Sequence, residues 1–519
     1  MRKIEHKPLS FSTTMRNPER ISEFVNCIKE FEGQILTNAL IMQIVKKVIK
    51  NKLYKPTCIT KESNLKEIYD NQELRFNDLQ LEYIIDKSPQ KHKEAGFDEG
   101  WPSRFDTWYK LCKEFGFVYY EMNKKIEVSP SGHMLCDAQL DNTGESGEKT
   151  QKIFLNSLVK YQTNNPFRRT STNNAPIPLL INVLKLLNKG TNSSGIHRKE
   201  LSFFICWNND DYVGLYKFII NFRKKHGFNA SSETVYEECL KLLKSKNRKR
   251  FKMSQILKES VDDLIRKLRI TGIFSLRGMG RFIDLNKMKI STINYIVKKY
   301  TKYKSYKSKY SYYKYVGNLD PIIISSKEKK IENFDEIRLI ALKKFSENYT
   351  KSQVFKEIKN LQLNVASKDE YLKLIDAPTR LEFLTSLAIM QKFPNYVVKP
   401  NYAIDDEGNP TYTAKGGLAD IEVYASDLDS LIEVTLMTSK QQAVNEIPAI
   451  ARHLKEQKGK SDKTHVFSIF VAPYVHVDSI FMCQFVMYKD NLGIYPYNII
   501  EFIEKLDASN SLLGLKYNV

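Results

Sequence analysis

The stretch Lys415–Leu454 most constrains the fold. It reads as strand, turn, strand and helix, because two runs of alternating apolar residues flank a turn near Asp427 and a helical period follows. A hairpin of this kind brings Asp420 beside Glu433 on one face of a sheet. Two neighbouring carboxylates are donors that a hard divalent cation prefers. The stretch therefore predicts a metal-dependent site in an α/β layer with helices on both faces.

Further groups in the same stretch can take part in hydrolysis of a phosphodiester, which needs an activated water and neutralised charge on the phosphate. The backbone carbonyl of Val434 is a candidate third metal ligand. Glu446 and His453 are seven residues apart, so one helix would present both on one face. Alternatively, Glu446 is a solvent-exposed charge and His453 is a residue of a polar rim. We expect Asp427 and Asp429 to be turn residues.

Positive charge is unevenly divided along the chain. The net charge is +21, with 81 Lys and Arg against 60 Asp and Glu. From Pro321 onward there are 24 basic and 26 acidic residues, so the first 320 residues hold 57 basic and 34 acidic residues, a net charge of +23. This division predicts that the first three-fifths of the chain bind a polyanion. A general basic bias would not spare the last 200 residues.

The remaining composition excludes several classes. The seven cysteines are scattered and never form a Cys-x-x-Cys pair, which argues against a zinc ribbon or a disulfide framework. The first residues lack the apolar segment of a signal peptide, and no run approaches the roughly 18 apolar residues of a membrane span. We therefore expect a cytoplasmic protein.

Two parts of the basic region, 100–135 and 260–285, share one order of elements: a helix, a glycine and two short strands. This order is typical of winged-helix modules, whose helix enters the major groove of DNA. We expect two DNA-recognition subdomains, 1–150 and 151–297. The expected DNA contacts are Arg16, Arg20, Arg104, Lys110, Lys113, Arg277 and Arg281. The arginines at the helix start and at the glycine turn could instead be ordinary solvent-exposed surface residues.

The segment 298–315 contains seven lysines and seven tyrosines. Such a composition cannot bury a core of its own, so 298–320 is predicted to be a linker or an arm that follows DNA. Gly317, Asp320 and Pro321 then indicate a domain boundary, at the point where the charge balance changes. We expect 321–519 to form the catalytic domain.

The motif Gly-x-x-Ala-Asp followed by Glu-Val-Thr resembles the PD-(D/E)xK nuclease signature in degraded form. From Leu9 to about Leu506, the chain resembles the AlwI-type family of type IIS restriction and nicking endonucleases. The stretches that carry this resemblance are FSTTMRNPERI (11–21), KHKEAGFDEGWPSRFDTWYK (91–110), TRLEFL (379–384), GGLADIEV (416–423) and IEVTLM (432–437). The long Gly-Trp-Pro-Ser-Arg-Phe-Asp-Thr-Trp match is more specific than the acidic motif.

The resemblance implies a multidomain α+β protein, with a helical, winged-helix-like recognition region before a FokI-like PD-(D/E)xK domain. It implies Mg²⁺ and cleavage at a fixed distance outside a short asymmetric site in double-stranded DNA. The implied catalytic residues are Glu382, Asp420, Glu433, Glu446 and His453. Asp420, Glu433 and Val434 would hold the metal. Implied partners are a second cleavage domain or a small nuclease subunit, and a cognate DNA methyltransferase.

The sequence departs from the family pattern at two positions. Ala419 replaces a proline, and Thr435 occupies the place of the motif lysine. Lys415 or Lys440 could substitute for that lysine; alternatively, Glu446 and His453 orient the water.

Three other functions remain open: a strand-specific nicking enzyme, a DNA-binding regulator without catalysis, and a resolvase or transposase subunit. A regulator would not cleave with Mg²⁺, and a resolvase would not need a defined sequence.

Overall fold

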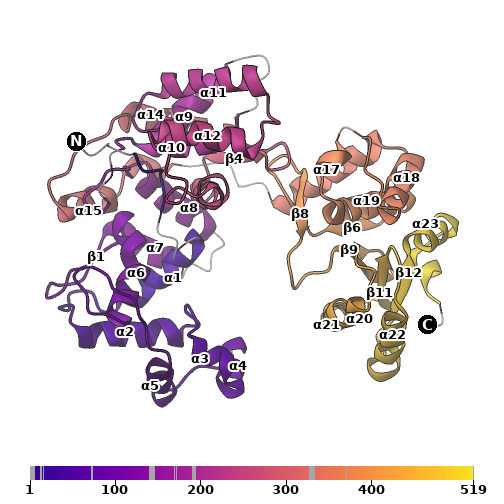
Figure 1. Ribbon diagram of the computed structural model, residues 1–519. Helices are drawn as coiled ribbons and strands as arrows, with labels where there is room; N and C mark the ends of the chain where they lie inside the picture. The colour runs from indigo at the N-terminus through magenta and orange to yellow at the C-terminus, as the bar shows by residue number, and fades with distance from the viewer. Residues whose placement is uncertain are drawn as a thin grey trace. The chain divides into compact units, whose positions relative to one another are not determined.

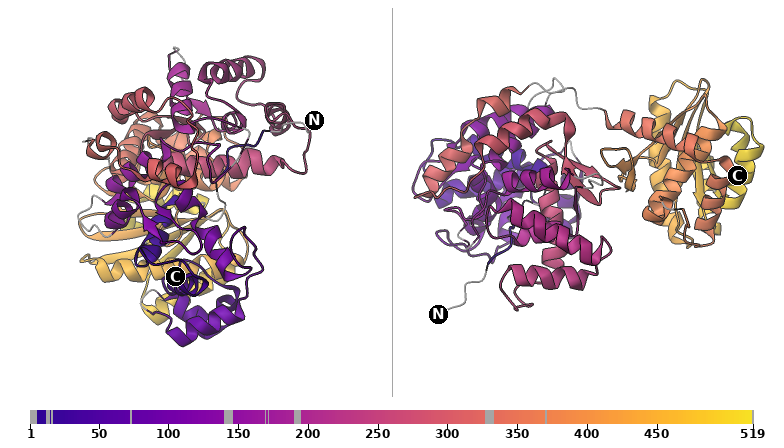
Figure 2. Two further views of the ribbon diagram at one scale, coloured as in Figure 1. Left: turned by 90° about the vertical axis from the view of Figure 1, so that its left-hand side faces the viewer. Right: turned by 90° about the horizontal axis from the view of Figure 1, so that it is seen from above.

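The computed structural model divides the chain into two compact units (Figures 1 and 2). The first comprises Met1–Ser275 and Ile283–Lys329, and the second comprises Leu276–Phe282 and Lys330–Val519. The residues that the structure describes are 6–11, 15, 17–71, 74–139, 146–168, 170, 172–189, 195–326, 333–369 and 371–517.

The first part of the chain is mainly helical. Its helices are η2 (Pro18–Arg20), α1 (Ile21–Lys29), α2 (Asn38–Lys50), α3 (Thr57–Lys61), α4 (Ser63–Asp70), α5 (Asp78–Lys87), α6 (Trp101–Glu114), α7 (Pro130–Gln139), α8 (Ser146–Leu158), α9 (Pro176–Leu187), α10 (Leu201–Cys206), α11 (Tyr212–His226), α12 (Ser232–Leu242), η3 (Gln255–Glu259), α13 (Ser260–Arg269), η4 (Lys287–Lys289), α14 (Ile290–Lys299), α15 (Lys309–Gly317) and α16 (Pro321–Ser325). Its strands are β1 (Val118–Tyr119), β2 (Glu127–Val128), β3 (Ile196–His197), β4 (Phe274–Arg277) and β5 (Phe282–Leu285).

The two predicted helix-and-hairpin patterns are present as elements. Helix α6 precedes the antiparallel pair β1–β2, and α13 precedes β4 and β5. In the second pattern, β5 lies between β4 and β3, and β3 was not predicted. The predicted subdomain boundary at 150/151 falls inside α8, which packs on α7. Buried Ile153, Phe154 and Leu158 give α8 the apolar face that fixes it there.

The Lys/Tyr-rich segment, predicted as a linker, folds within the first unit. Its helix α15 buries Tyr312 and Tyr313 completely and packs on β1, α7 and α8. A Cβ atom on Gly116 would lie 2.5 Å from the amide nitrogen of Gly317, so the ends of α6 and α15 meet at two glycines. The expectation was wrong for α15 because tyrosines that cannot form a core alone can complete one with helices from elsewhere.

The second unit contains the main sheet. Its helices are α17 (Phe334–Asn348), α18 (Lys351–Gln362), η5 (Leu372–Leu374), α19 (Ala377–Lys392), α20 (Gln441–Asn445), α21 (Ile447–Lys460), α22 (Val477–Asp490), α23 (Ile499–Ala508) and η6 (Leu512–Leu515). Its strands are β6 (Val397–Pro400), β7 (Tyr402–Ile404), β8 (Pro410–Ala414), β9 (Ile421–Tyr424), β10 (Leu428–Val434), β11 (His465–Ala472) and β12 (Ile494–Asn498).

Five of these strands form a mixed sheet in the order β12-β11-β10-β9-β6. Strands β10, β11 and β12 are parallel, whereas β9 and β6 are antiparallel to their neighbours. Strands β7 and β8 form a separate hairpin. Parallel strands buried on both faces require nearly continuous apolar runs, which explains the composition of β11, HVFSIFVA.

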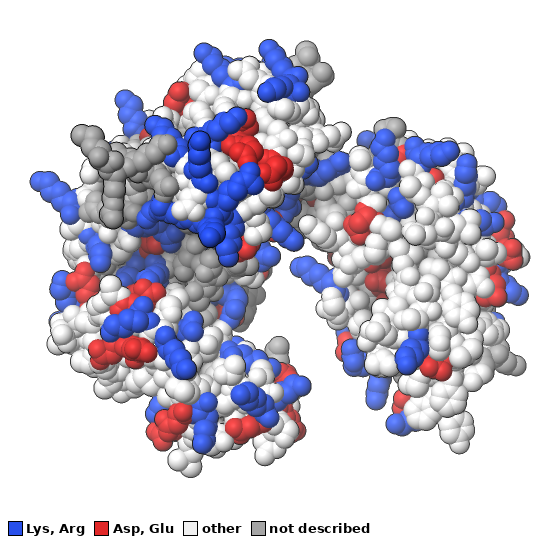
Figure 3. All heavy atoms as spheres, viewed as in Figure 1, with Lys and Arg blue, Asp and Glu red and all other residues white. Residues whose placement is uncertain are grey.

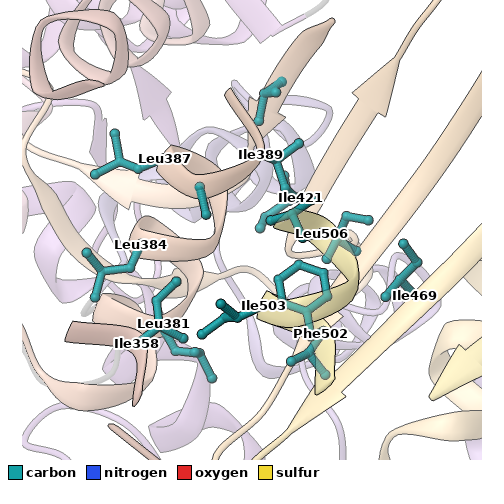
Figure 4. Packing of buried hydrophobic residues seen from close by; sticks show 14 of the residues in the cluster. Ile358, Leu381, Leu384, Leu387, Ile389, Ile421, Ile469, Phe502, Ile503 and Leu506 are labelled. Carbon is teal, nitrogen blue, oxygen red and sulfur yellow. The ribbon is translucent and has the colours of Figure 1, made fainter. Parts of the chain in front are cut away.

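Helices cover both faces of the sheet, as predicted. Ile432 belongs to the larger apolar cluster, formed with α18, α19 and α23, and Figure 4 shows side chains of this cluster. The preceding residue, Leu431, belongs to the smaller cluster, formed with α21 and α22. This alternation places α19 and α21 on opposite faces of β10. The fold is therefore mixed α/β.

Candidate functional site

The acidic hairpin has the predicted pairing. Ile432 is opposite Ile421, so the next residues along the two strands, Glu433 and Asp420, meet where the ladder ends. The Asp420 amide donates to Glu433 Oε2 at 3.3 Å, and the Val434 amide donates to Asp420 Oδ2 at 2.8 Å. The hairpin therefore places the two carboxylates side by side.

Helix α21 adds a histidine to this pair. It packs on β10 and β11, and His453 Nδ1 lies 2.9 Å from Glu433 Oε1. The side chains of His453 and Glu433 are 13% and 10% exposed. The hydrogen bond with Glu433 raises the pKa of His453 above its ordinary value, although burial alone would lower it. His453 therefore contacts the acidic pair directly.

Glu446 lies near the acidic pair, but it is not on the same helix as His453, as the sequence had predicted. Pro448 starts a new helix, α21, so Glu446 lies at the junction with α20 and does not share one helix with His453. Thr435 Oγ1 donates to Glu446 Oε1 at 3.4 Å. Burial and then the charge of Glu433 raise the pKa of Glu446. The single-helix prediction was wrong because it treated a proline at a helix start as a helix interior.

Glu382 belongs to the same electrostatic cluster. It lies on α19, is 3% exposed, and accepts a hydrogen bond from the Ala414 amide at 3.0 Å. Burial raises its pKa to about 8, and the charge of Glu433 contributes. Burial also raises the pKa of Asp420 well above its ordinary value, and the charges of Glu433 and Glu382 add to the effect. The carboxylates therefore repel one another, and a cation bound among them would remove that cost.

Asp429 was predicted to be a turn residue, and the structure places it in a strand. It lies in β10 opposite Tyr424, is 5% exposed, and accepts hydrogen bonds from Gln457 and Ser461. Asp427 is exposed in the turn, as expected. Asp429 was misassigned because the turn is shorter than predicted and β10 begins at Leu428.

Asn401 is a residue that the sequence reasoning missed. Its amide donates to the Asp420 carbonyl at 2.9 Å, and its side chain donates to the Ala419 carbonyl at 2.8 Å and to Glu422 at 3.0 Å. These bonds fix the backbone that carries Asp420. An asparagine after a proline gives no local signal of this role, because the pairing of β6 with β9 creates it.

The side chains present suit a hard cation with few protein ligands. Within the described ranges, no group of three or more His, Cys, Asp or Glu side chains is arranged to hold a metal ion. Mg²⁺, however, is usually bound through one or two carboxylates, with water and phosphate completing its shell. Asp420 and Glu433 provide two adjacent carboxylates. The Val434 amide points toward Asp420, so the carbonyl of this strand residue is directed to the same side.

The two lysines considered as substitutes for the motif lysine are both exposed. Lys415 precedes the hairpin and Lys440 precedes α20. Among the residues that the structure describes, neither forms an ion pair. Thr435 instead directs its hydroxyl to Glu446.

The predicted DNA contacts on α6 are already engaged within the protein. The Lys113 side chain is 12% exposed and lies 3.1 Å from the carboxylate of Asp106, so its charge already has a partner within the protein. Lys110 lies 3.6 Å from Asp106, and Arg104 donates to Gln90 at 2.9 Å.

The remaining predicted DNA contacts are four arginines outside α6. Arg16 lies outside the described residues, and Arg20 is exposed and donates to a backbone carbonyl between α2 and α3. Arg277 pairs with Glu407 at 3.2 Å, and Arg281 donates to a carbonyl of its own turn at 3.2 Å. The DNA contacts predicted for the seven residues stay predictions: Arg16, Arg20, Arg104, Lys110, Lys113, Arg277 and Arg281.

The glycine turn that carries Arg277 and Arg281 belongs to the second unit. The Met279 amide donates to Asp405 at 2.8 Å, and the Leu276 amide donates to Asp406 at 2.7 Å. In this structure the turn therefore contacts the β7–β8 loop, an arrangement that the sequence did not predict.

Two predictions from composition can be compared with the structure. All seven cysteines are free and buried. Among the described helices, none has the length and apolar character needed to cross a bilayer.

Comparison with known proteins identifies the class. A family model described as AlwI restriction endonuclease matches residues 113–375 and 325–504, more than half of the chain. The protein is thus a site-specific DNA nuclease. It belongs to the AlwI restriction endonuclease family.

Solved structures similar to this chain are also restriction endonucleases. The small subunit R.BspD6I2 of the heterodimeric restriction endonuclease R.BspD6I is 21% identical, with 32% of this chain and 82% of that chain covered, at a TM-score of 0.25. Restriction endonuclease FokI is 12% identical, with 98% and 97% covered, at a TM-score of 0.23. FokI bound to DNA is 11% identical, with 98% and 96% covered, at 0.22. No curated protein sequence matches. The family assignment rests on the family model alone.

Proposed function

We propose that this protein is a Mg²⁺-dependent type IIS endonuclease, which binds a short asymmetric DNA site and hydrolyses the DNA at a fixed distance outside it. The observation that carries the proposal is that Asp420 and Glu433 are adjacent and that His453 is hydrogen-bonded to Glu433. A divalent metal held there would activate water and neutralise charge on the phosphate.

Each nearby side chain has a proposed part. Asp420, Glu433 and the Val434 carbonyl hold the metal. His453 fixes the orientation of Glu433 through its 2.9 Å hydrogen bond. Glu446, held by Thr435, orients the water in place of the absent motif lysine. The buried carboxyl of Glu382, with a pKa of about 8, keeps a proton near neutral pH until a cation enters the cluster.

The first unit supplies DNA recognition in this proposal, and α6 and α13 are the helices of its winged-helix-like modules. Figure 3 shows many Lys and Arg side chains on the first unit and a broad uncharged surface on the second. The first 320 residues hold all the excess positive charge. A polyanion is the partner that such a surface binds.

A second cleavage domain is the proposed partner of the second unit. Exposed apolar side chains follow one stripe of α22: Val477, Ile480, Phe481, Phe485 and Tyr488. Such a stripe on a water-facing helix indicates a protein contact. If the partner is a second copy, both DNA strands are cut. If it is a separate small nuclease subunit, this chain alone nicks one strand. A DNA methyltransferase that protects the same site completes the proposed system.

The proposal is tested by digesting supercoiled plasmid with Mg²⁺ and sequencing the ends. We expect ends at one fixed offset from a defined sequence. Glu433→Gln should lower the cleavage rate by about 10³-fold, because metal catalysis contributes several kcal/mol. Asp427→Asn, an exposed acid on the same hairpin, is the matched control and should cut normally.

Two results would contradict the proposal. The first is the absence of any defined-site product from the wild-type protein. The second is wild-type activity in Glu433→Gln, which would move the chemistry elsewhere. A product nicked on one strand would select the nicking alternative.

A further inference from the structure

The segment Lys241–Lys252, KLLKSKNRKRFK, is denser in positive charge than the Lys/Tyr-rich segment. Seven of its twelve side chains are Lys or Arg, and all seven are exposed. It begins with the last two residues of α12 in the first unit and ends before η3. None of these residues was among the predicted DNA contacts. So many like charges repel one another unless an anion lies against them.

The acids of α12 neutralise only part of this charge. Arg248 pairs with Glu233 at 2.7 Å and also with Glu237, and Lys241 pairs with Glu238 at 2.7 Å. Four exposed lysines form no ion pair with any described residue: Lys244, Lys246, Lys249 and Lys252. These lysines are free to meet an external partner, whereas Lys113 of α6 is not.

Backbone bonds hold the segment in one shape. Lys244 has a left-handed φ of 51°, and the next amide, that of Ser245, donates to the Leu240 carbonyl at 3.1 Å. Further along, Asn247 accepts from the Arg250 amide at 3.0 Å. The charges therefore project from an ordered loop, and binding would order only their side chains.

The loop also borders a hollow. An open cavity of about 520 Å³ lies against the end of α12 and is lined by Glu237, Leu240, Lys241, Lys244, Ser245, Lys246 and Arg248. Mainly cationic groups thus surround a space accessible to solvent. Ammonium groups act as point charges that contact phosphates without reading bases.

We propose that Lys241–Lys252 is a surface that binds the phosphate backbone of duplex DNA without reading its sequence. This inference rests on the proposed function, because it assumes that DNA lies along the first unit. The surface contributes salt-dependent affinity that is equal for cognate and unrelated DNA.

The test compares three full-length proteins: the wild type, a variant with Lys244, Lys246, Lys249 and Lys252 changed to Gln, and a control. The control changes four exposed lysines of α17 and α18 to Gln: Lys343, Lys344, Lys356 and Lys359. Dissociation constants for cognate and unrelated duplexes are measured in EDTA, which prevents cleavage, over a series of NaCl concentrations. Thermal melting checks that each protein is folded, and Lys249→Gln alone is the milder variant.

In the four-lysine variant, we expect the slope of log Kd against log salt to fall by about 1 for each lysine that contacts a phosphate. Affinity should fall by the same factor for both duplexes, and the control should keep the wild-type slope. An unchanged slope would overturn the inference. So would a loss confined to the cognate duplex, or a loss of binding to phosphatidylserine vesicles with DNA binding intact.

The proposed function can fail separately. If wild-type protein yields no defined-site products from plasmid, the endonuclease proposal is wrong, while the salt slopes still decide the role of this surface.

Discussion

The two units differ in where their charged side chains lie. The first exposes its charge: the loop Lys241–Lys252 presents seven cations to solvent, and most lack an acidic neighbour. The second has a nearly neutral sequence but buries acids together, so the pKa values of Asp420, Glu382 and Glu446 all rise. Exposed charge attracts a polyanion over a long range, whereas buried charge of one sign stores unfavourable energy that a cation can relieve. The predictions below test this contrast.

The largest effect should come from the buried acids in metal-free protein. Folding raises the pKa of Glu382 from an ordinary 4.5 to about 8, so the folded state holds this proton more tightly. The resulting stability is fully present below about pH 4.5 and is lost as pH rises toward 8, with a slope of up to about 1.4 kcal/mol per pH unit.

Chemical denaturation in EDTA across this range measures that slope. Glu382→Gln should flatten it, and Glu347→Gln, an exposed acid on α17, should not. An equal slope in the Glu382→Gln protein would show that the buried acids do not store the energy assigned to them.

Next in size, Lys113→Met should lower the free energy of unfolding by about 3 kcal/mol, because it leaves the buried carboxylate of Asp106 with only the more distant cation of Lys110. Lys110→Met, on a half-exposed side chain, should cost less than about 1 kcal/mol. Urea denaturation measures both. If Lys113→Met kept the wild-type stability but bound DNA more weakly, Lys113 would be a DNA contact and not a structural partner of Asp106.

A smaller effect on catalysis is expected from His453→Gln. Cleavage should slow by about 10- to 100-fold, the usual result of removing a group that orients a metal ligand. DNA affinity in EDTA should not change, because His453 belongs to the buried cluster. Lys455→Gln, an exposed change on the same helix, is the control. Cleavage at the wild-type rate would make His453 a structural residue only.

The smallest effect should follow from changing the two exposed lysines near the hairpin. Lys415→Gln and Lys440→Gln should each leave the cleavage rate within about twofold of wild type, as isolated surface charges usually do. A loss as large as that of Glu433→Gln in either variant would identify that lysine as the substitute for the motif lysine at Thr435.

The acidic hairpin could be predicted well because its information is local. Side chains alternate along a strand with a period of two, so the apolar residues of β9 and β10 also fix which acids meet. The same reasoning failed for Asp429, where a turn shorter by a residue or two changes a turn position into a strand position. It also failed at Pro448, which starts a helix and divides Glu446 from His453.

By itself, the sequence determined the charge division, the family resemblance and the pairing of Asp420 with Glu433, because composition, motifs and strand alternation are written along the chain. Only the tertiary structure decided which other groups join them. Glu382 comes from α19 and His453 from α21, on opposite faces of β10, and Asn401 reaches Asp420 through the pairing of β6 with β9. It also decided that Lys113 turns toward Asp106 and that the cations of Lys241–Lys252 stay exposed. Burial and long-range packing set these outcomes, and neither follows from the spacing of residues along one element.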